Sequence, residues 1–422
     1  MLPQQLGIDL SFLDGGSGLS YTKALVVPIH NAKPGKDHHV RMGMHAFDGS
    51  YSLISAVPFP LGTPNCSAAS SLNFTVQSAT KGKDNFVLVT SNASSEAEAA
   101  AANVSVVVNA NIFWGAAAMF SMSTDGPSSS PVSYVFDAGE LGQVTVAFSQ
   151  PPRTLPSSTC CAKTSWTPRH AKCAMLEFAV GATPLAISLS FSGRQTPSVS
   201  ATAALVAAAN ANARAEIVAG GKKVGGGTMT EAYDAMATAI AWNVNFDPRV
   251  AVTCPVSRTF ESGFDFIFFD WDMYFLSLMA GTLPAAANSA AFDIAISNLI
   301  ETTQTRSAYG QVMNKRAASG SSTSDTNDRS EPYVGSMVTH RIWQDAQGTE
   351  RAATLAWVVD LLFPSLLGWN QWCLKRRYNV GKPGGGLIVL GNDNNLPCEG
   401  STVGLNSSRQ HCAAPGMNQR GA

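Results

Sequence analysis

The chain of 422 residues has few charged side chains and almost equal numbers of each sign. Charged residues make up 14% of the sequence, against about 25% in an average soluble protein, and the formal net charge is −1. Because no basic block or stripe occurs, nucleic acid and anionic membrane surfaces are excluded as expected partners. The length allows two or more domains, each with a core of its own.

Long uninterrupted apolar runs are also missing. Residues 352–369 come nearest to a membrane span, but Asp360 and Pro364 interrupt them, which indicates a core helix and no membrane span. The first residues show no basic segment followed by an apolar one, so no signal peptide is readable. Asn-x-Ser/Thr sequons slightly favour the secretory pathway or the extracellular space, which leaves the compartment undecided. These sequons begin at Asn65, Asn73, Asn92, Asn103 and Asn406.

The eight cysteines show no spacing typical of a metal site. Three of them, within residues 160–173, are compatible with one disulfide or with ordinary buried thiols. His38, His39 and His45 lie close in sequence, but no carboxylate or cysteine stands at ligand spacing, which favours surface histidines. The glycines of residues 220–227 lack the GK[ST] ending of a phosphate loop. We therefore expect neither a metal nor a cofactor.

The first part of the chain has the period of two that is typical of β-strands. In residues 185–192, large apolar side chains alternate with alanine and serine, and residues 143–150 repeat the pattern. Residues 24–31, 85–92 and 103–114 are further strand candidates. Strands separated by Gly, Pro and Ser turns, without helical periodicity between them, predict an antiparallel β-sandwich over residues 1–200.

Residues 201–230 are predicted to link this domain to a second one, residues 231–395. The linker is rich in alanine and helix-prone, and it ends in a flexible glycine-rich stretch. From about 228 the apolar period is helical, and in one such segment Asn298 and Glu301 lie on the polar face. Successive helices with short connections suggest stacked antiparallel hairpins. The predicted helices are about 229–244, 270–281, 287–305, 331–345, 349–363 and 366–377.

The most informative segment is FIFFDWDMYF, residues 266–275, in which Asp270 and Asp272 flank Trp271 within an apolar run. Burying an ionised carboxylate without partners costs several kcal/mol, so such a pair indicates a function. A sugar, which needs hydrogen-bond acceptors beside an aromatic wall, is the commonest ligand of this kind. The alternative is an aspartate at a helix start, which one of the two satisfies easily. We favour the sugar for Asp272 and the helix start for Asp270.

Three longer segments carry a resemblance to a known family. They are AWNVNFDPRVAVTCPVSRTFESGFDFIFFDWDMYFLSLMAG (241–281), GQVMN (310–314) followed by SDTNDRSEPYVGSMV (324–338), and LLFPSLLGWNQWCLKRRYN (361–379) leading into GLIVLGNDN (386–394). The order and spacing of their motifs resemble glycoside hydrolase family 63, in the branch that includes mannosylglycerate hydrolase and processing α-glucosidase relatives. The resemblance covers about 235–395.

This resemblance implies an (α/α)6 barrel that holds one sugar ring at its centre and inverts the anomeric carbon. Inverting hydrolysis needs a carboxylic acid that protonates the leaving oxygen and a carboxylate that activates water. For the two tryptophans of the WNxW motif, the alternative to sugar contact is packing of one helix against another. For Arg329, the alternative is an ion pair that orders its own loop. The residues implied to contact the sugar are Asp270, Trp271, Asp272, Asp328, Arg329, Glu331, Trp369 and Trp372.

The sequence departs from the family at the catalytic positions. The family's acid lies in an ESGxDNSP-type segment after LIxLG, and its base lies near the last helices of the barrel. ESGFD (261–265) imitates the acid segment but precedes FDWD, so we interpret Asp265 as a decoy. We therefore expect a truncated member: a β-sandwich, an incomplete (α/α)6 toroid with about half of the helices, and an irregular tail over 396–422.

Such a chain is expected to take an oligosaccharide or small glycoside but to be inactive alone, so its standing as an enzyme stays open. Helices without their partners leave apolar faces in water, which predicts aggregation or a need for another polypeptide, either a missing C-terminal half or a chaperone. The alternatives are a non-catalytic fragment that binds carbohydrate or protein, and an unrelated α-helical interaction protein with a β-sandwich.

Overall fold

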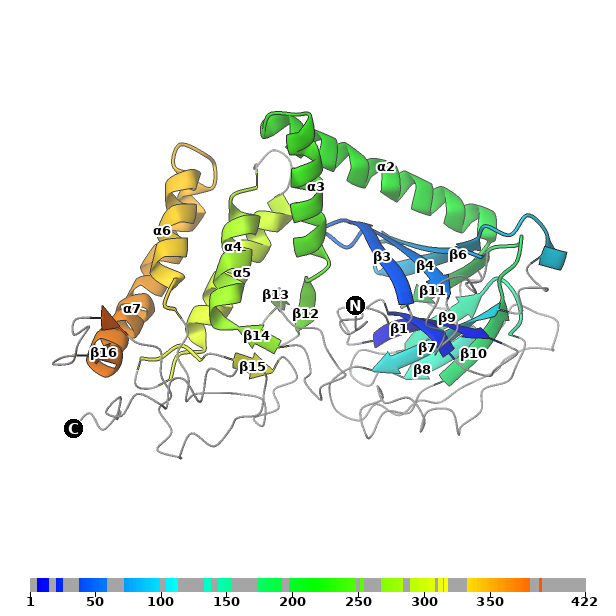
Figure 1. Cartoon of the computed structure of the whole chain (residues 1–422), viewed down its shortest axis with the longest axis horizontal. Helices are drawn as coiled ribbons and strands as arrows, with labels where there is room; N and C mark the ends of the chain where they lie inside the picture. Colours follow the sequence, from blue (N-terminus) through cyan, green and yellow to red (C-terminus); the bar gives the residue numbers. More distant parts are fainter. Residues whose placement is uncertain are drawn as a thin grey trace. The chain divides into compact units, whose positions relative to one another are not determined.

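The computed structural model of the chain has a mixed β and α architecture with two compact units (Figure 1). The β-rich unit comprises Met1–Trp242 with Arg258–Gly263, and the helical unit comprises Asn243–Ser257 with Phe264–Ala422. The structure describes residues 6–14, 20–25, 38–58, 72–98, 104–112, 133–137, 143–152, 174–191, 197–247, 251–253, 267–283, 289–307, 310–313, 315–317, 332–379 and 387–388.

The β-rich unit contains two antiparallel sheets. One has the strand order β10-β7-β1-β2 and the other the order β3-β4-β5-β6-β11-β9-β8. Four of the predicted strands are confirmed, as β6, β7, β9 and β11, whereas most of the candidate at 24–31 lies outside the described residues. The strands are β1 (Leu6–Asp14), β2 (Ser20–Leu25), β3 (His38–His45), β4 (Tyr51–Pro58), β5 (Phe74–Lys81), β6 (Asp84–Ser91), β7 (Val104–Ile112), β8 (Ser133–Asp137), β9 (Gln143–Phe148), β10 (Ala174–Ala179) and β11 (Leu185–Ser190).

Strand β11 is buried along both of its faces, and two different layers cover them. Leu185, Ile187 and Leu189 belong to an apolar cluster that draws residues from both sheets. Ala186, on the opposite face, packs with residues of α2 (Val199–Lys223), including Val206. The alternation of large and small residues in this strand therefore separates two buried faces, one against bulky partners and one against a helix.

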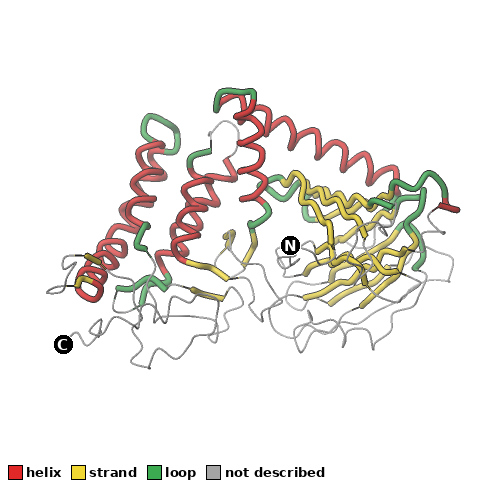
Figure 2. The backbone as a smooth tube through the Cα atoms, viewed as in Figure 1, coloured by secondary structure: helices red, strands yellow, loops and turns green. Residues whose placement is uncertain are grey.

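The segment expected to link two domains is helical, in keeping with its alanine content, and packs on the larger sheet. Ser198 caps α2, because its side-chain oxygen accepts the backbone N–H of Ala201 at 3.1 Å. The small alanine side chains of α2 let the helix pack closely on strands β4, β5 and β6 (Figure 2). Three glycines with positive φ, at 225–227, then turn the chain into α3 (Thr228–Ala241). The division between the units follows Trp242, whose indole N–H donates to the carbonyl oxygen of Gly43 at 2.7 Å.

In the described part of the helical unit, four helices pack on one another, both between sequence neighbours and across one intervening helix. Helix α4 packs on α5 and α6, and α7 packs on α5 and α6. Their shared core includes Tyr274, Leu299, Val338, Leu362 and Trp369. The elements are α4 (Asp270–Gly281), α5 (Ser289–Gln304), α6 (Gly335–Ala346), α7 (Ala352–Arg377) and the short strands β12 (Asn245–Asp247), β13 (Ala251–Thr253), β14 (Ile267–Phe269), β15 (Lys315–Ala317), β16 (Tyr378–Asn379) and β17 (Leu387–Ile388).

The prediction of two helices at 349–363 and 366–377 was wrong, because α7 is continuous through Pro364. A proline inside a helix removes one backbone hydrogen bond and crowds the carbonyl group four residues earlier. Here that carbonyl belongs to Asp360, and both residues are exposed, so water is able to solvate the freed group. By length and composition α7 also resembles a membrane span at Ala352–Lys375, a property that it shares with core helices of soluble proteins.

Candidate functional site

The start of α4 places Asp270, Trp271 and Asp272 in one helical turn. Asp270 is 2% exposed, and its Oδ1 accepts the backbone N–H of Trp271 at 2.6 Å. Both carboxylates lie where the helix dipole favours negative charge. Asp270 is the first residue of α4, whereas the N-cap position belongs to Phe269, which makes no side-chain cap bond. Asp270 thus lies at the helix start but is not the N-cap that the alternative predicted.

Trp271 and Asp272 are more accessible than Asp270. The Trp271 indole is 38% exposed and makes an edge-to-face contact with the ring of Phe275, with 6.1 Å between the ring centroids. Asp272 is partly exposed. An exposed aromatic face beside a carboxylate is chemically suited to a sugar, because the ring covers C–H groups while the carboxylate accepts hydroxyl protons.

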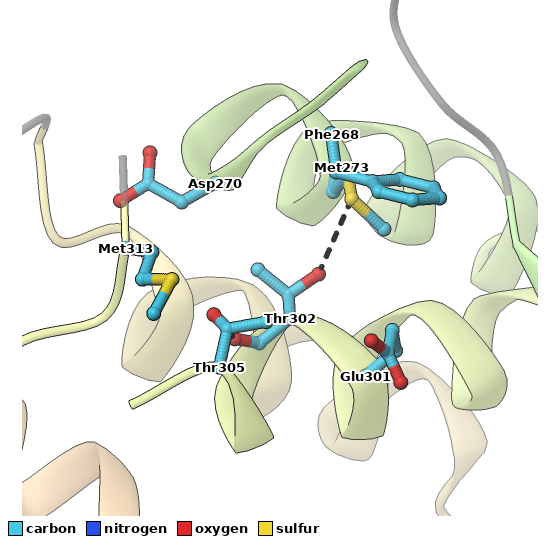
Figure 3. A pocket seen from close by; sticks show the side chains of 7 residues that line it. All are labelled: Phe268, Asp270, Met273, Glu301, Thr302, Thr305 and Met313. Atoms are coloured by element: carbon cyan, nitrogen blue, oxygen red, sulfur yellow. Dashed lines mark hydrogen bonds between the residues drawn. The ribbon is translucent and has the colours of Figure 1, made fainter. Parts of the chain in front are cut away.

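A small hollow lies behind this turn, between α4 and α5 (Figure 3). Its volume is about 10 Å³, which is room for one water molecule at most. The carboxyl groups of Asp270 and Glu301 lie on opposite sides of Thr302 in this view. Known ligand pockets occupy several hundred Å³, so this hollow does not hold a sugar ring. Its lining residues are Phe268, Asp270, Met273, Glu301, Thr302, Thr305 and Met313.

Trp369 and Trp372 lie in the core of the helical unit. Trp369 is 1% exposed, stacks on Tyr274 with 5.8 Å between ring centroids, and meets Tyr333 edge to face at 6.3 Å. Trp372 is buried in the same cluster. Among the described residues, these two side chains therefore have the surroundings of helix packing. This is the alternative to sugar contact that the sequence left open.

The three motif segments meet in this core. Gly335, from the second segment, lies so close to Tyr274 of the first and Leu366 of the third that an added Cβ would stand 2.7 and 2.9 Å from them. At Gly310, which has a φ of +100°, an added Cβ would stand 3.0 Å from the carbonyl oxygen of Gly368. Segments up to a hundred residues apart in sequence thus form one tightly packed arrangement, in which small residues allow the close approach.

Polar contacts hold the same core together. The Asn370 amide donates to Ser336 Oγ at 2.8 Å and so joins α7 to α6. Tyr274 Oη and Thr303 Oγ1 are 2.9 Å apart and share a hydrogen bond between α4 and α5. Burial raises the pKa of Tyr274, so its hydroxyl stays protonated and keeps this bond over the ordinary pH range.

Sequence reasoning missed several polar residues of the core. Asn298 and Glu301 were assigned to the polar face of their helix, but both are buried, as are Thr302 and Thr303. The helical periodicity of this segment was identified correctly. Because α5 packs against other elements on more than one side, however, the polar side of the helix is buried as well. The run of polar side chains ETT at 301–303 gave no signal that distinguishes a buried network from a solvated face.

Other predicted residues lie outside the described part of the chain. These are Asp328, Arg329 and Glu331, the decoy Asp265, the cysteines of residues 160–173 and the tail at 396–422. Within the described residues, His45 stacks on Trp242 with 4.5 Å between ring centroids, and no group of three metal-ligating side chains occurs.

Gly335→Ala is expected to lower the free energy of unfolding of the helical unit by about 1–3 kcal/mol, because the new methyl group overlaps the Tyr274 ring. Urea denaturation of the full chain, followed by hydrogen exchange in α4 and α6, measures this loss. Gly368→Ala is the control: its Cβ meets only the end of the Arg306 side chain, at 3.2 Å, and alanine favours a helix interior. Equal losses in the two variants would contradict the close packing at Gly335.

Comparison of the chain with models of known protein families gives no match, and no curated protein matches it either.

Proposed function

We propose that this chain is a glycoside hydrolase-like protein of an inverting exo-α-glycosidase lineage, in which Trp271 and Asp272 contact a glucoside or mannoside. The observation that carries the proposal is the meeting of the three motif segments around Tyr274, Gly335 and Leu366. A sugar site built from all three segments requires them to lie together, and this packing meets that requirement. Trp271 and Asp272, which lie on the same helix as Tyr274, are accessible to a ligand.

The finer architecture belongs to this proposal. We infer an antiparallel β-sandwich followed by about half of an (α/α)6 toroid. One apolar cluster shared by the two sheets supports the first part, and the packing of α4 with α5 and of α6 with α7 supports the second. In this proposal Asp270 has a structural role at the start of α4. The buried Trp369 and Trp372 pack behind the sugar site and do not contact the sugar.

None of the described residues is assigned here as the proton donor or the water-activating base. The proposed role is therefore sugar binding, and 4-nitrophenyl α-glucoside and mannosylglycerate should both remain intact in the presence of the chain. Hydrolysis that is lost in Asp265→Asn would overturn this assignment and give Asp265 the role of the acid.

Binding of methyl α-glucoside and methyl α-mannoside to the full chain tests the proposal directly. Asp272→Asn is expected to weaken binding about tenfold to a hundredfold, the effect of replacing one charge-assisted hydrogen bond. Trp271→Ala should weaken it similarly. Asp293→Asn, which replaces an exposed aspartate on α5, and Trp357→Ala, which removes an exposed indole on α7, are the matched controls. Binding that is absent, or lowered equally by the controls, would refute the sugar site.

A second function, that of a non-catalytic interaction module, is favoured by one observation. Helix α7 exposes large apolar side chains on the face opposite its buried one, and Trp357 and Phe363 are the most exposed of them. Such a face is typical of a surface that another polypeptide covers.

A further inference from the structure

Two of the sequons, at Asn73 and Asn92, come together at one end of the β-rich unit. Asn73 directly precedes β5 and Asn92 directly follows β6, and the register of this strand pair joins Phe74 to Ser91. The two asparagines are therefore the next cross-strand pair. Cross-strand neighbours of this kind project from the same face of a sheet, with Cβ atoms about 5 Å apart.

Both asparagines are exposed, and the backbone that carries them is held in place. Leu72 and Phe74, on either side of Asn73, are fully buried, so the Asn73 side chain leaves the sheet on the other side. The backbone N–H of Asn92 donates to the carbonyl oxygen of Asn73 at 3.0 Å. The pair is thus a fixed feature of the sheet end and not a chance approach of two loops.

A side-chain bond also orients the Asn92 amide. Its Oδ1 accepts the backbone N–H of Asn73 at 2.6 Å, which turns Nδ2, on the other side of the amide group, away from the Asn73 backbone. A glycosylated asparagine keeps its amide oxygen, so this bond is compatible with a sugar on Nδ2.

The loop after Asn92 is fastened to a neighbouring turn of the same unit. Ser91 Oγ donates to the carbonyl oxygen of Gly181 at 2.8 Å, and the Thr183 N–H donates to Glu96 Oε1 at 2.8 Å. Ser94, the hydroxyl residue of the sequon, is exposed and donates to Glu98 Oε2 at 2.8 Å. The backbone on either side of the exposed Asn92 is therefore held in place.

We propose that Asn73 and Asn92 form a paired N-glycosylation site, with two glycans that emerge side by side from the β5–β6 end of the sheet. In each case the amide Nδ2 bonds to C1 of an oligosaccharide carried on a polyprenyl diphosphate. The bond from C1 to the diphosphate oxygen breaks, the diphosphate leaves with its electron pair, and the amide loses one proton. The glycans solubilise this end of the sheet and shield it from contact with other proteins.

The test uses the full chain, produced in eukaryotic cells behind a cleavable secretory leader. Molecules whose leader has been removed are treated with peptide N-glycosidase in ¹⁸O-labelled water, which converts each glycosylated asparagine into labelled aspartate. Mass spectrometry of the peptides is expected to find the label at both Asn73 and Asn92. Unlabelled asparagine at either position in these molecules would overturn the paired site.

Matched variants distinguish the loss of a sequon from a change in the structure around it. Thr75→Ala and Ser94→Ala each abolish one sequon while keeping both asparagines, so each should remove the mass of one glycan. Thr75→Ser and Ser94→Thr keep the sequons and should keep both glycans. A glycan that remains at Asn73 in Thr75→Ala, or at Asn92 in Ser94→Ala, would contradict the assignment.

Discussion

Replacement of Trp369 by alanine is expected to lower the free energy of unfolding of the helical unit by about 3–5 kcal/mol. The indole is 1% exposed and packs between Tyr274 and Tyr333, so its removal loses buried apolar area and leaves a cavity that helices cannot easily close. Because the two units of the chain need not unfold together, hydrogen exchange in α4 and α7 should follow the urea transition of the helical unit.

Trp357→Ala provides the matched control, since it removes the same side chain from the same helix at a position that is 58% exposed. Exposed substitutions of this kind change stability by about 0.5 kcal/mol or less. A loss at Trp369 no greater than that at Trp357 would show that the aromatic cluster does not hold the helical unit together.

The second large effect concerns the exposed apolar face of α7, which we define as Trp357, Leu361, Phe363, Leu367 and Leu374. Each of these side chains is between 42% and 59% exposed, opposite a buried face that is also apolar. Large apolar side chains exposed to this extent on one helix are typical of a surface that another polypeptide covers. We therefore expect the isolated chain to associate with itself through this face at micromolar concentrations.

The double substitution Trp357→Lys with Phe363→Lys is expected to weaken this association about a hundredfold or more. Burial of each such side chain contributes about 1.5–3 kcal/mol, and buried lysines would repel one another across the contact. Sedimentation velocity over a range of concentrations measures the change. Val218→Lys with Met229→Lys, which alters two similarly exposed apolar residues of the β-rich unit, is the control. If the wild-type chain stays monomeric over this range of concentrations, the prediction that this face causes self-association is wrong.

Sequence periodicity was a good guide to individual elements and a poor guide to what covers them. The alternation in residues 185–190 identified β11, and the helical period identified α4 with the observed bounds. The layers on either side depend on segments distant in sequence, however. Nothing in the pattern of β11 indicated that α2 would bury its small-residue face, because Ala and Ser suit a solvated face and a helix-covered one equally.

The candidate site divides in the same way. The unusual run around Trp271 was recognised from its residue types, since acids within an aromatic segment need an explanation. Its division into a buried helix-start aspartate and an accessible Trp–Asp pair was decided by the packing of α4. The tryptophans of the third motif segment show the same limit, because a sequence does not tell an aromatic that lines a hollow from one that fills a core.

The amino-acid sequence by itself determined the change from strands to helices, the helix with carboxylates in its first turn, and the three motif segments. It placed the helical period from about residue 228, whereas the first helix after the strands, α2, begins at Val199. Local backbone preference and side-chain period depend only on neighbouring residues, so a sequence carries them directly. Only the tertiary structure decided that these segments meet at Gly335 and Gly368, that α7 continues through Pro364, and that Asn73 and Asn92 face each other. Each of these depends on which distant surface fills the neighbouring space, and that is a property of the packed chain as a whole.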